Sequence, residues 1–414
     1  MPDDKRGRKA EPTAVGPARR RMSRTERARA DRLRRRRRRA VLGLGGVLVT
    51  MAVIAAVFVG SKLWHSSTPV VDFTGEGGPQ VLIEVHEGDW TSAVADTLRN
   101  AGVIAEVGPF LTIAQSSAAV QAIQPGFYRL RTEIPAATAV QELTDPANRV
   151  GKLVIPEGRQ LDDTVEARTG RVTPGVFTLI AEASCLDLED EHHCLKAADL
   201  RRASETESLQ ALSVPDWAIG PATKMGHDHR RIEGLIMAGT WNVDPTAPAP
   251  TVLAKLIAQS GAELAKSGLT QTAAQLGMTP YDLLVVASLV QRESLPQDFA
   301  KVARVIDNRL REPQRLEFDS TVNYPLDRQE VATTDADRAK VTPWNTYASE
   351  GLPATPICSP GMEALQAAEH PEPGDWLYFV TIDKDGTTLF THSYQQHLNN
   401  IELALGNGVL DSSR

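Results

Sequence analysis

One carboxyl group stands at the end of a long apolar segment, where it could act as a general acid. Residues 281–292 read YDLLVVASLVQR, and Glu293 follows them directly. A carboxyl group at such a position loses hydration, which disfavours its charged form and raises its pKa towards the operating pH. The spacing also allows a plainer interpretation, in which Glu293 is a surface residue paired with Arg292 or Arg304.

The segment before Glu293 has the composition of a buried helix, because it is apolar on all sides. Thr279-Pro280 is a suitable start, since proline is favoured at the first helical position. Proline-rich loops follow a second helix further on. The elements expected in this half are helices at 251–261, 281–292, about 298–311 and 362–370, and strands at 376–380 and 388–391 that form a hairpin.

A pattern of strand, Glu-Gly turn and helix occurs twice in the preceding part of the chain. Its copies are strand 81–85, turn 87–88 and helix 91–98, and then strand 152–155, turn 156–158 and helix 161–167. Gly102 would end the first helix, and a further strand is expected at 126–130. Residues 181–230 are polar and acidic with poor periodicity, which predicts a surface loop region or an insertion.

The charges of the chain are divided between two regions of opposite sign. Residues 1–39 hold 17 Lys and Arg against five acidic residues, whereas the whole chain of 414 residues has a net charge of −7. The remainder is therefore strongly acidic. A folded part of that sign repels phosphate, so we expect no nucleic-acid partner.

A hydrophobic run of twenty residues without a charge, 40–59, begins where the basic region ends. As a helix it would span about 30 Å, the thickness of a bilayer core. The arginine run 34–39 before it predicts a cytoplasmic N-terminus, contact with membrane lipid and an outward-facing remainder. Trp64 would lie at the interface. The alternatives are a cleaved signal peptide, which the length of the run disfavours, or a nucleic-acid-binding tail.

The three cysteines all follow this hydrophobic run. Cys185 and Cys194 bracket an acidic loop, CLDLEDEHHC, and a disulfide between them is expected outside the membrane. A metal site that uses His192, His193 and the thiolates is the alternative, although its spacing fits no usual tetrahedral pattern. Cys358 is left over as a buried free thiol.

Seven short stretches occur in a fixed order between residues 286 and 380. They read VASLVQRES, VARVIDNRL, FDSTVNY, TPWNTY, GLPATPICSPG, ALQAAEHP and DWLYFV. Their order and spacing resemble the endolytic murein transglycosylase (YceG-like) family. The similarity covers most of residues 150–405 and extends weakly to residue 80. It implies an α+β fold, with a single N-terminal transmembrane helix, a LysM-like α/β region and a mixed α+β catalytic domain.

The resemblance and the charge pattern together divide the chain into seven segments. These are a basic cytoplasmic arm (1–39), a transmembrane helix (40–60), a linker (61–78), an N-terminal LysM-like region (79–150), a second LysM-like unit with the acidic loop region (151–230), the catalytic domain (231–405) and a tail (406–414).

The resemblance also implies which residues form the site. The family has Glu-Lys-Glu-Thr where this chain has residues 291–294, so its second glutamate matches Glu293, the catalytic residue, while Gln291 replaces the first. An upstream family motif matches Glu233-Gly234, although its later Pro and Asp are Ala238 and Gly239 here. The substrate-binding candidates carried over from the other motifs are Asp319, Thr321, Tyr324, Asn345, Thr346, Tyr347 and Ser359.

These candidates have structural alternatives that the sequence leaves open. Asp319 could orient Glu293 or cap a turn, and the tyrosines could stack on sugars or pack in the core. Asn345 and Thr346 could bind acetamido groups or brace a proline-rich loop, while Ser359 could be a helix N-cap. The pair Arg304 and Arg309 could contact peptide carboxylates or form a solvated face.

The activity implied by the resemblance is cleavage of the MurNAc–GlcNAc β-1,4 bond in peptidoglycan glycan strands to leave 1,6-anhydro ends. One carboxyl group suffices for this reaction, because the attacking hydroxyl belongs to the substrate. The implied partners are these strands and membrane-bound peptidoglycan synthases, with no cofactor and no metal. A water-using muramidase and a non-catalytic wall-binding scaffold are the alternatives.

Overall fold

The computed structural model describes residues 51, 53–57, 71–189, 191–312, 314–326, 328–329 and 333–409. The chain divides into two units, residues 1–70 and 71–414. Of the predicted span 40–60, residues 51 and 53–57 are described, and they are helical and exposed. Among the described residues, no single helix is long and apolar enough to cross a membrane. The arm and most of the linker lie outside the described residues.

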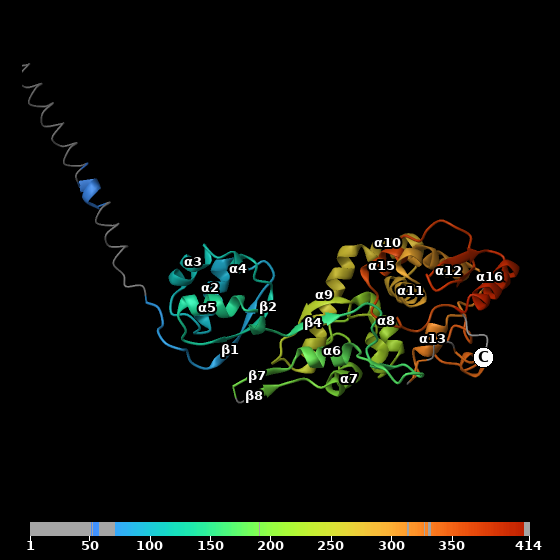
Figure 1. Cartoon of the computed structure of the whole chain (residues 1–414), viewed down its shortest axis with the longest axis horizontal. Coiled ribbons are helices and arrows are strands. Elements are labelled where there is room, and N and C mark those ends of the chain that lie inside the picture. Colours follow the sequence, from blue (N-terminus) through green and yellow to red (C-terminus); the bar gives the residue numbers. More distant parts are fainter. Residues whose placement is uncertain are drawn as a thin grey trace, which may run out of the picture. The chain divides into compact units, whose positions relative to one another are not determined.

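The first part of the larger unit is a three-stranded antiparallel sheet with helices (Figure 1). Its strands are ordered β1-β2-β3, and Ile83 of β1 lies opposite Tyr128 of β2. The strand and helix predicted at 81–85 and 91–98 are confirmed, as is the strand at 126–130. The elements are β1 (Gln80–Val85), α2 (Thr91–Asn100), α3 (Val107–Ala114), α4 (Ala118–Gln121), β2 (Gly126–Arg131), α5 (Ala136–Thr144), the 3-10 turn η1 (Pro146–Asn148) and β3 (Arg149–Val150).

This region has its own hydrophobic core. Alternate residues of β1 and β2 face the helices, so that Ile83 and Leu130 are buried together with Leu98 and Phe110. The cluster contains only residues from this part of the chain. Residues 80–150 therefore have a hydrophobic core of their own, which is a property of domains.

The second strand–turn–helix copy differs from the first, and the helix predicted at 161–167 is wrong. Its strand, β4 (Lys152–Ile155), pairs with the distant β9 (Gly239–Asn242). Residues 161–167 instead contain β5 (Thr164–Val165), paired with β6 (Val172–Thr173). The Leu161 N–H donates to a buried carboxylate, that of Glu233, at 3.2 Å. Because tertiary partners take the backbone groups here, a local helix does not form.

The region 181–230 is largely ordered, which corrects the prediction of surface loops. It packs into the main core through a few well-spaced apolar side chains, including Leu200, Leu212 and Ala218, all fully buried. Most residues of this region are polar, so the spacing of its few apolar residues was not recognised in the sequence. The elements are α6 (Val176–Ala183), β7 (Leu186–Leu188), β8 (Glu191–His193), α7 (Ala197–Thr206), α8 (Asp216–Lys224) and the 3-10 turn η2 (His229–Ile232).

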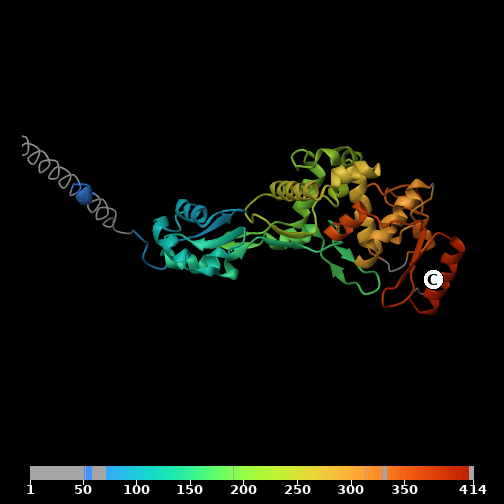
Figure 2. The same cartoon turned by 90° about the horizontal axis from the view of Figure 1, so that it is seen from above.

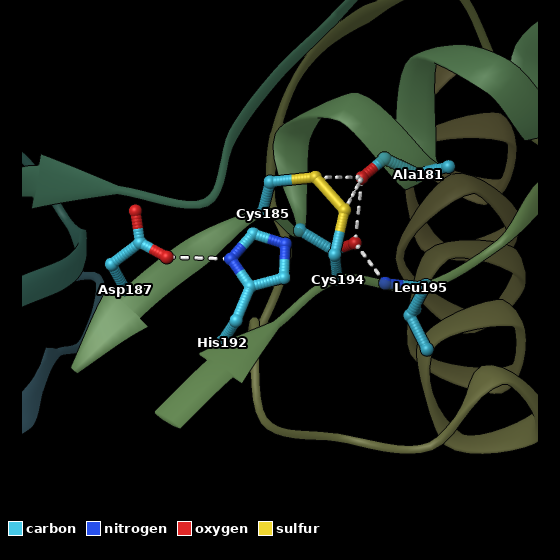
Figure 3. Close-up of a disulfide and its surroundings, with 7 residues drawn as sticks. Ala181, Cys185, Asp187, His192, Cys194 and Leu195 are labelled. Carbon is cyan, nitrogen blue, oxygen red and sulfur yellow. Dashed lines mark hydrogen bonds and ion pairs between the residues drawn. A yellow bond between two sulfur atoms is a disulfide. The ribbon is translucent and has the colours of Figure 1, made fainter. Parts of the chain in front are cut away.

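A disulfide joins Cys185 and Cys194 at the base of the β7–β8 hairpin (Figure 3). Both sulfur atoms approach the Ala181 carbonyl at the end of α6. The His192 ring bonds to the Asp187 carboxylate at 2.5 Å across the hairpin. The thiolates that a metal site would need are therefore used in the disulfide.

The helix α11 (Pro280–Glu293) forms the centre of the main core, as its sequence predicts. Residues from Leu283 to Val290 are all buried, and α12 (Phe299–Arg311) and α15 (Met362–Glu369) pack against it. Its start is fixed by a capping box in which Thr279 and Asp282 satisfy each other's backbone N–H groups. α9 (Ala249–Ser267) and α10 (Leu269–Leu276) precede it, and η3 (Pro296–Asp298) follows it.

The last part of the chain contains two short helices, a hairpin and a final helix. The predicted hairpin is confirmed, with Phe379 of β10 opposite Phe390 of β11. β10 packs against both α12 and the last helix, which appears red in Figures 1 and 2. The elements are α13 (Asp319–Asn323), α14 (Asp335–Arg338), β10 (Tyr378–Thr381), β11 (Thr388–Thr391) and α16 (Tyr394–Gly406).

Candidate active site

Glu293 is the last residue of α11 and its side chain is half-buried. Burial and, to a lesser extent, the negative charge of Asp319 raise the pKa of its carboxyl group, Ser320 and Arg292 lower it, and the net pKa is about 7. The alternative of a surface ion pair between Glu293 and Arg304 is wrong, because the Arg304 guanidinium bonds to the Asp307 carboxylate at 2.5 Å. A carboxyl group that titrates near neutral pH can both donate and accept a proton.

Asp319 is the first residue of α13 and is held by three side chains. Its Oδ1 accepts hydrogen bonds from the Thr333 hydroxyl at 2.7 Å and the Tyr347 hydroxyl at 2.8 Å, and Arg338 forms an ion pair with it at 3.0 Å. Burial alone would raise the pKa of Asp319, but these partners outweigh it and lower the pKa. Asp319 is therefore an ionised carboxylate beside a largely neutral one.

Ser320 is a site residue that sequence reasoning missed. Its hydroxyl and backbone N–H approach the Glu293 carboxyl group closely enough to lower its pKa. The hydroxyl is buried and makes no hydrogen bond of full geometry within the described part of the chain. This places a polar group from the start of α13 directly against the candidate acid. The only signal in the sequence was its place between Asp319 and Thr321.

Thr321, Asn345 and Thr346 are buried, and their polar atoms contact protein. The Thr321 and Thr346 hydroxyls lie 2.9 Å apart, and Thr346 Oγ1 accepts from the Phe318 N–H at 3.0 Å. Asn345 Oδ1 accepts from the Tyr347 N–H at 2.9 Å. These contacts fix the loop before Tyr347 against the start of α13, so they position the partners of Asp319.

Tyr324 and Ser359 bind other parts of the protein. The Tyr324 hydroxyl donates to Glu233 Oε2 at 2.7 Å, and its ring packs edge-on against Trp344. Ser359 donates to the Ile236 carbonyl at 2.7 Å, and the N-cap of α15 is Gly361, so the N-cap alternative for Ser359 is wrong.

Arg309 is buried, so the alternative of a solvated face is wrong for this residue. Its guanidinium donates to the carbonyls of Leu377 and Leu316. It thereby connects the end of α12 to the segments before β10 and α13. Its partner in the proposed pair, Arg304, donates to the Glu372 carbonyl at 2.8 Å.

Two neighbouring cavities lie beyond the end of α11. The first, of about 360 Å³, is lined by Arg292 but not by Glu293 itself. The second, of about 310 Å³, is lined by Glu233 and Tyr324. Both volumes fall in the range of about 300–1,000 Å³ that ligand pockets occupy. The residues that line both cavities are Gln160, Asp162 and Thr164.

The fold and the site define a mixed α+β protein in which a half-buried glutamic acid with a pKa near neutral lies beside an ionised carboxylate. Residues 83–403 match the model of the YceG-like family, so the chain belongs to that family. It is 26% identical over 324 residues to the endolytic murein transglycosylase of Bacillus subtilis (strain 168), which covers 77% of this chain and 82% of that relative.

The chain is also similar to a second curated relative and to one solved structure. The endolytic murein transglycosylase of Streptococcus pneumoniae serotype 2 (strain D39 / NCTC 7466) is 24% identical over 335 residues, 78% of this chain and 58% of that relative. A crystal structure of a putative YceG-like protein from Listeria monocytogenes aligns with a TM-score of 0.49 and 23% identity, over 78% of this chain and 99% of that one.

Proposed function

We propose that this protein is an endolytic lytic transglycosylase that cleaves the MurNAc–GlcNAc β-1,4 bond of peptidoglycan. The observation that carries the proposal is the half-buried Glu293 at the end of α11, where its pKa is near neutral and the ionised Asp319 lies close to it. Membership of the YceG-like family and the names of the curated relatives support the substrate class.

In the proposed mechanism Glu293 serves first as acid and then as base. The protonated carboxyl group donates its proton to the glycosidic oxygen, and the bond from that oxygen to C1 of MurNAc breaks. The carboxylate then takes the proton of the MurNAc C6 hydroxyl, whose oxygen bonds to C1 and closes the 1,6-anhydro ring. The proton count balances without water, and Glu293 ends protonated as it began.

Asp319 suits a supporting role in this reaction. A fixed negative charge stabilises the positive charge that develops on the sugar as the bond breaks. It also keeps the pKa of Glu293 high enough for a large share of the group to carry a proton near pH 7. Glu293 contacts the reacting atoms in this proposal, whereas Asp319 acts through charge.

The test is product analysis of digested glycan strands by mass spectrometry. Wild-type protein should release fragments with 1,6-anhydro ends, and Glu293→Gln should lower the rate by about 10²–10⁴-fold while still binding glycan. Reducing ends would indicate a water-using muramidase instead. Equal product release by Glu293→Gln would remove Glu293 from the mechanism, and binding without any products from wild type would leave a wall-binding scaffold.

We further propose that residues 40–60 anchor the protein in the cell membrane, with the N-terminus in the cytoplasm and the site outside. The uncharged run 40–59 and the arginines before it support this orientation. An anchored enzyme reaches glycan close to the membrane, where membrane-bound synthases extend it. In whole cells, an added protease should remove residues after 60 and spare a tag placed before residue 39.

A further inference from the structure

A second buried glutamate, Glu233, lies in the wall of the 310 Å³ cavity. Only 1% of its surface is exposed. Its Oε2 accepts hydrogen bonds from the Tyr324 hydroxyl at 2.7 Å and the Leu161 N–H at 3.2 Å. Its Oε1 is buried and has no hydrogen-bond partner in the described part of the chain. One oxygen is therefore held in place by the protein and the other is left for a ligand.

The cavity is built so that its positive charges are already neutralised. His229 bonds to Asp162 at 2.6 Å, Arg201 pairs with the same carboxylate, and Arg230 pairs with Asp228 at 2.8 Å. An anionic ligand would find no free cation among these side chains. The free Glu233 oxygen is thus the polar group that the cavity offers to a neutral ligand.

The chemistry of that oxygen is set by its surroundings. Burial and the charge of Asp162 raise the pKa of Glu233, and hydrogen bonding from Tyr324 and from the backbone N–H groups of Leu161 and Gly234 only partly offsets this, so that the net pKa is about 8. Because Oε2 already accepts two hydrogen bonds, the proton belongs on Oε1. A neutral carboxylic acid donates a hydrogen bond and therefore selects an acceptor oxygen.

We infer that this cavity is a subsite for an uncharged N-acetylated sugar unit, GlcNAc, in which Glu233 Oε1 donates a hydrogen bond to the acetamido carbonyl. The inference rests on the proposed glycan substrate. Gln160, Asp162 and Thr164 line both this cavity and the one that Arg292 lines, so the two cavities are neighbours and a glycan chain could extend from one into the other.

The close approach of Pro356 explains why Glu233 is followed by glycine. Gly234 has a φ of +75°, and a Cβ placed there would lie 2.5 Å from the Pro356 side chain. The backbone can therefore turn at this point, and Glu233 can face the cavity, only with glycine next to it.

The experiment measures binding of a GlcNAc–MurNAc tetrasaccharide by calorimetry to the full chain carrying Glu293→Gln, so that nothing is cleaved. Adding Glu233→Gln keeps an N–H donor in place of the acid and should change the affinity at pH 6 by less than about twofold. Adding Glu233→Met removes the donor and should weaken binding about tenfold, the effect of one hydrogen bond. Glu363→Gln, at an exposed position of α15 away from this cavity, is the control.

Comparison between pH 6 and pH 9 separates ligand binding from a structural role. Glu233 loses its proton over this interval, so the Glu293→Gln protein should bind the tetrasaccharide about tenfold more weakly at pH 9. The same protein with Glu233→Gln added should bind equally at both values. If the Glu233→Met protein does not fold, the comparison of pH 6 with pH 9 in the other two proteins is sufficient to test the inference.

Other groups around Glu233 do not reproduce that result. Burial keeps the pKa values of Tyr281, Tyr324 and Cys358 above pH 9, and Asp162 has a lowered pKa. The remaining ionisable neighbours that line the cavity, Asp163, Arg201, His229 and Arg230, are present in both proteins.

Three outcomes would overturn the inference. They are equal pH dependence with and without Glu233→Gln, unchanged affinity in a folded Glu233→Met protein, and an effect of Glu363→Gln as large as that of Glu233→Met. In those cases the cavity does not bind a sugar through Glu233. Anhydro products from wild type would still support the proposed function. Absence of both products and glycan binding would instead reject the proposed function itself.

Discussion

Asp319 lies close enough to Glu293 for its negative charge to raise the pKa of the Glu293 carboxyl group. The two residues come from different elements, the end of α11 and the start of α13. Asp319 is itself kept ionised by Arg338, Thr333 and Tyr347. The pair thus consists of one carboxyl group that holds a proton near neutral pH and one that does not, which is the division an acid and a charge stabiliser need.

Removing the charge of Asp319 should shift the pH profile of the enzyme. In wild type, kcat/KM should fall as pH rises through about 7, because Glu293 loses the proton that it must donate. Asp319→Asn should lower the pKa of Glu293 and move this limb to lower pH. The control is Asp335→Asn, since Asp335 is fully exposed and contacts the same Arg338. An unchanged limb in Asp319→Asn would show that the two carboxyl groups are not coupled.

The opposite shift is expected for Ser320→Ala. Ser320 lowers the pKa of Glu293, so loss of its hydroxyl should raise that pKa and move the descending limb to higher pH. The pH dependence of kcat/KM measures this directly, with the exposed Ser349→Ala as control. A shift in the same direction as that of Asp319→Asn would contradict the geometry around Glu293.

Loss of the Thr346 hydroxyl should destabilise the loop that positions Tyr347. Thr346→Val leaves the Phe318 N–H and the Thr321 hydroxyl without this partner in a buried place. We expect the free energy of unfolding in urea to fall by about 1–3 kcal/mol. Thr251→Val, on the exposed side of α9, should change it by less than about 0.5 kcal/mol. Equal stability of the two variants would show that the Thr346 bonds contribute little.

The disulfide should stabilise the β7–β8 hairpin region. Cys185 and Cys194 are nine residues apart, and closing a loop of that size contributes about 2–3 kcal/mol in the chain-entropy model. Dithiothreitol should therefore lower the Tm of wild type. It should leave the Tm of the double variant Cys185→Ser/Cys194→Ser unchanged, and an equal drop in both proteins would assign the effect to something other than this bond.

The buried Glu233 should make stability depend on pH. Its pKa is about 8 in the folded protein and near 4.5 when unfolded, so the folded state holds the proton between these values. Stability from this group is full below about pH 4.5 and falls as pH rises to about 8, by about 1.4 kcal/mol per pH unit. Urea unfolding at pH 6, 7 and 8 should show a shallower fall for Glu233→Gln, while the exposed Glu363→Gln keeps the wild-type slope. Parallel slopes would mean that Glu233 ionises in the folded protein as it does in the unfolded chain.

Much of the scaffold could be predicted because it depends on local patterns. The apolar run of α11, its Thr279 start and the alternation of β1 are visible within a few residues of sequence. The helix predicted at 161–167 failed because the Leu161 carbonyl accepts from the Phe177 N–H at 3.1 Å and the Ala167 N–H donates to the Gln329 carbonyl at 2.9 Å, which are the groups a local helix would need. The order within 181–230 was missed because a few apolar residues, such as Leu200, bury themselves among many polar ones.

The sequence by itself determined the candidate acid, since a glutamate at the end of an apolar helix loses water wherever that helix is buried. It also determined the family resemblance and the pairing expected of Cys185 with Cys194. Only the tertiary structure decided that Asp319 and Ser320 lie against Glu293, and that Glu233 faces a cavity with one oxygen free. These relationships join residues far apart in the chain, and their energies depend on distance and burial, which no local pattern of residues specifies.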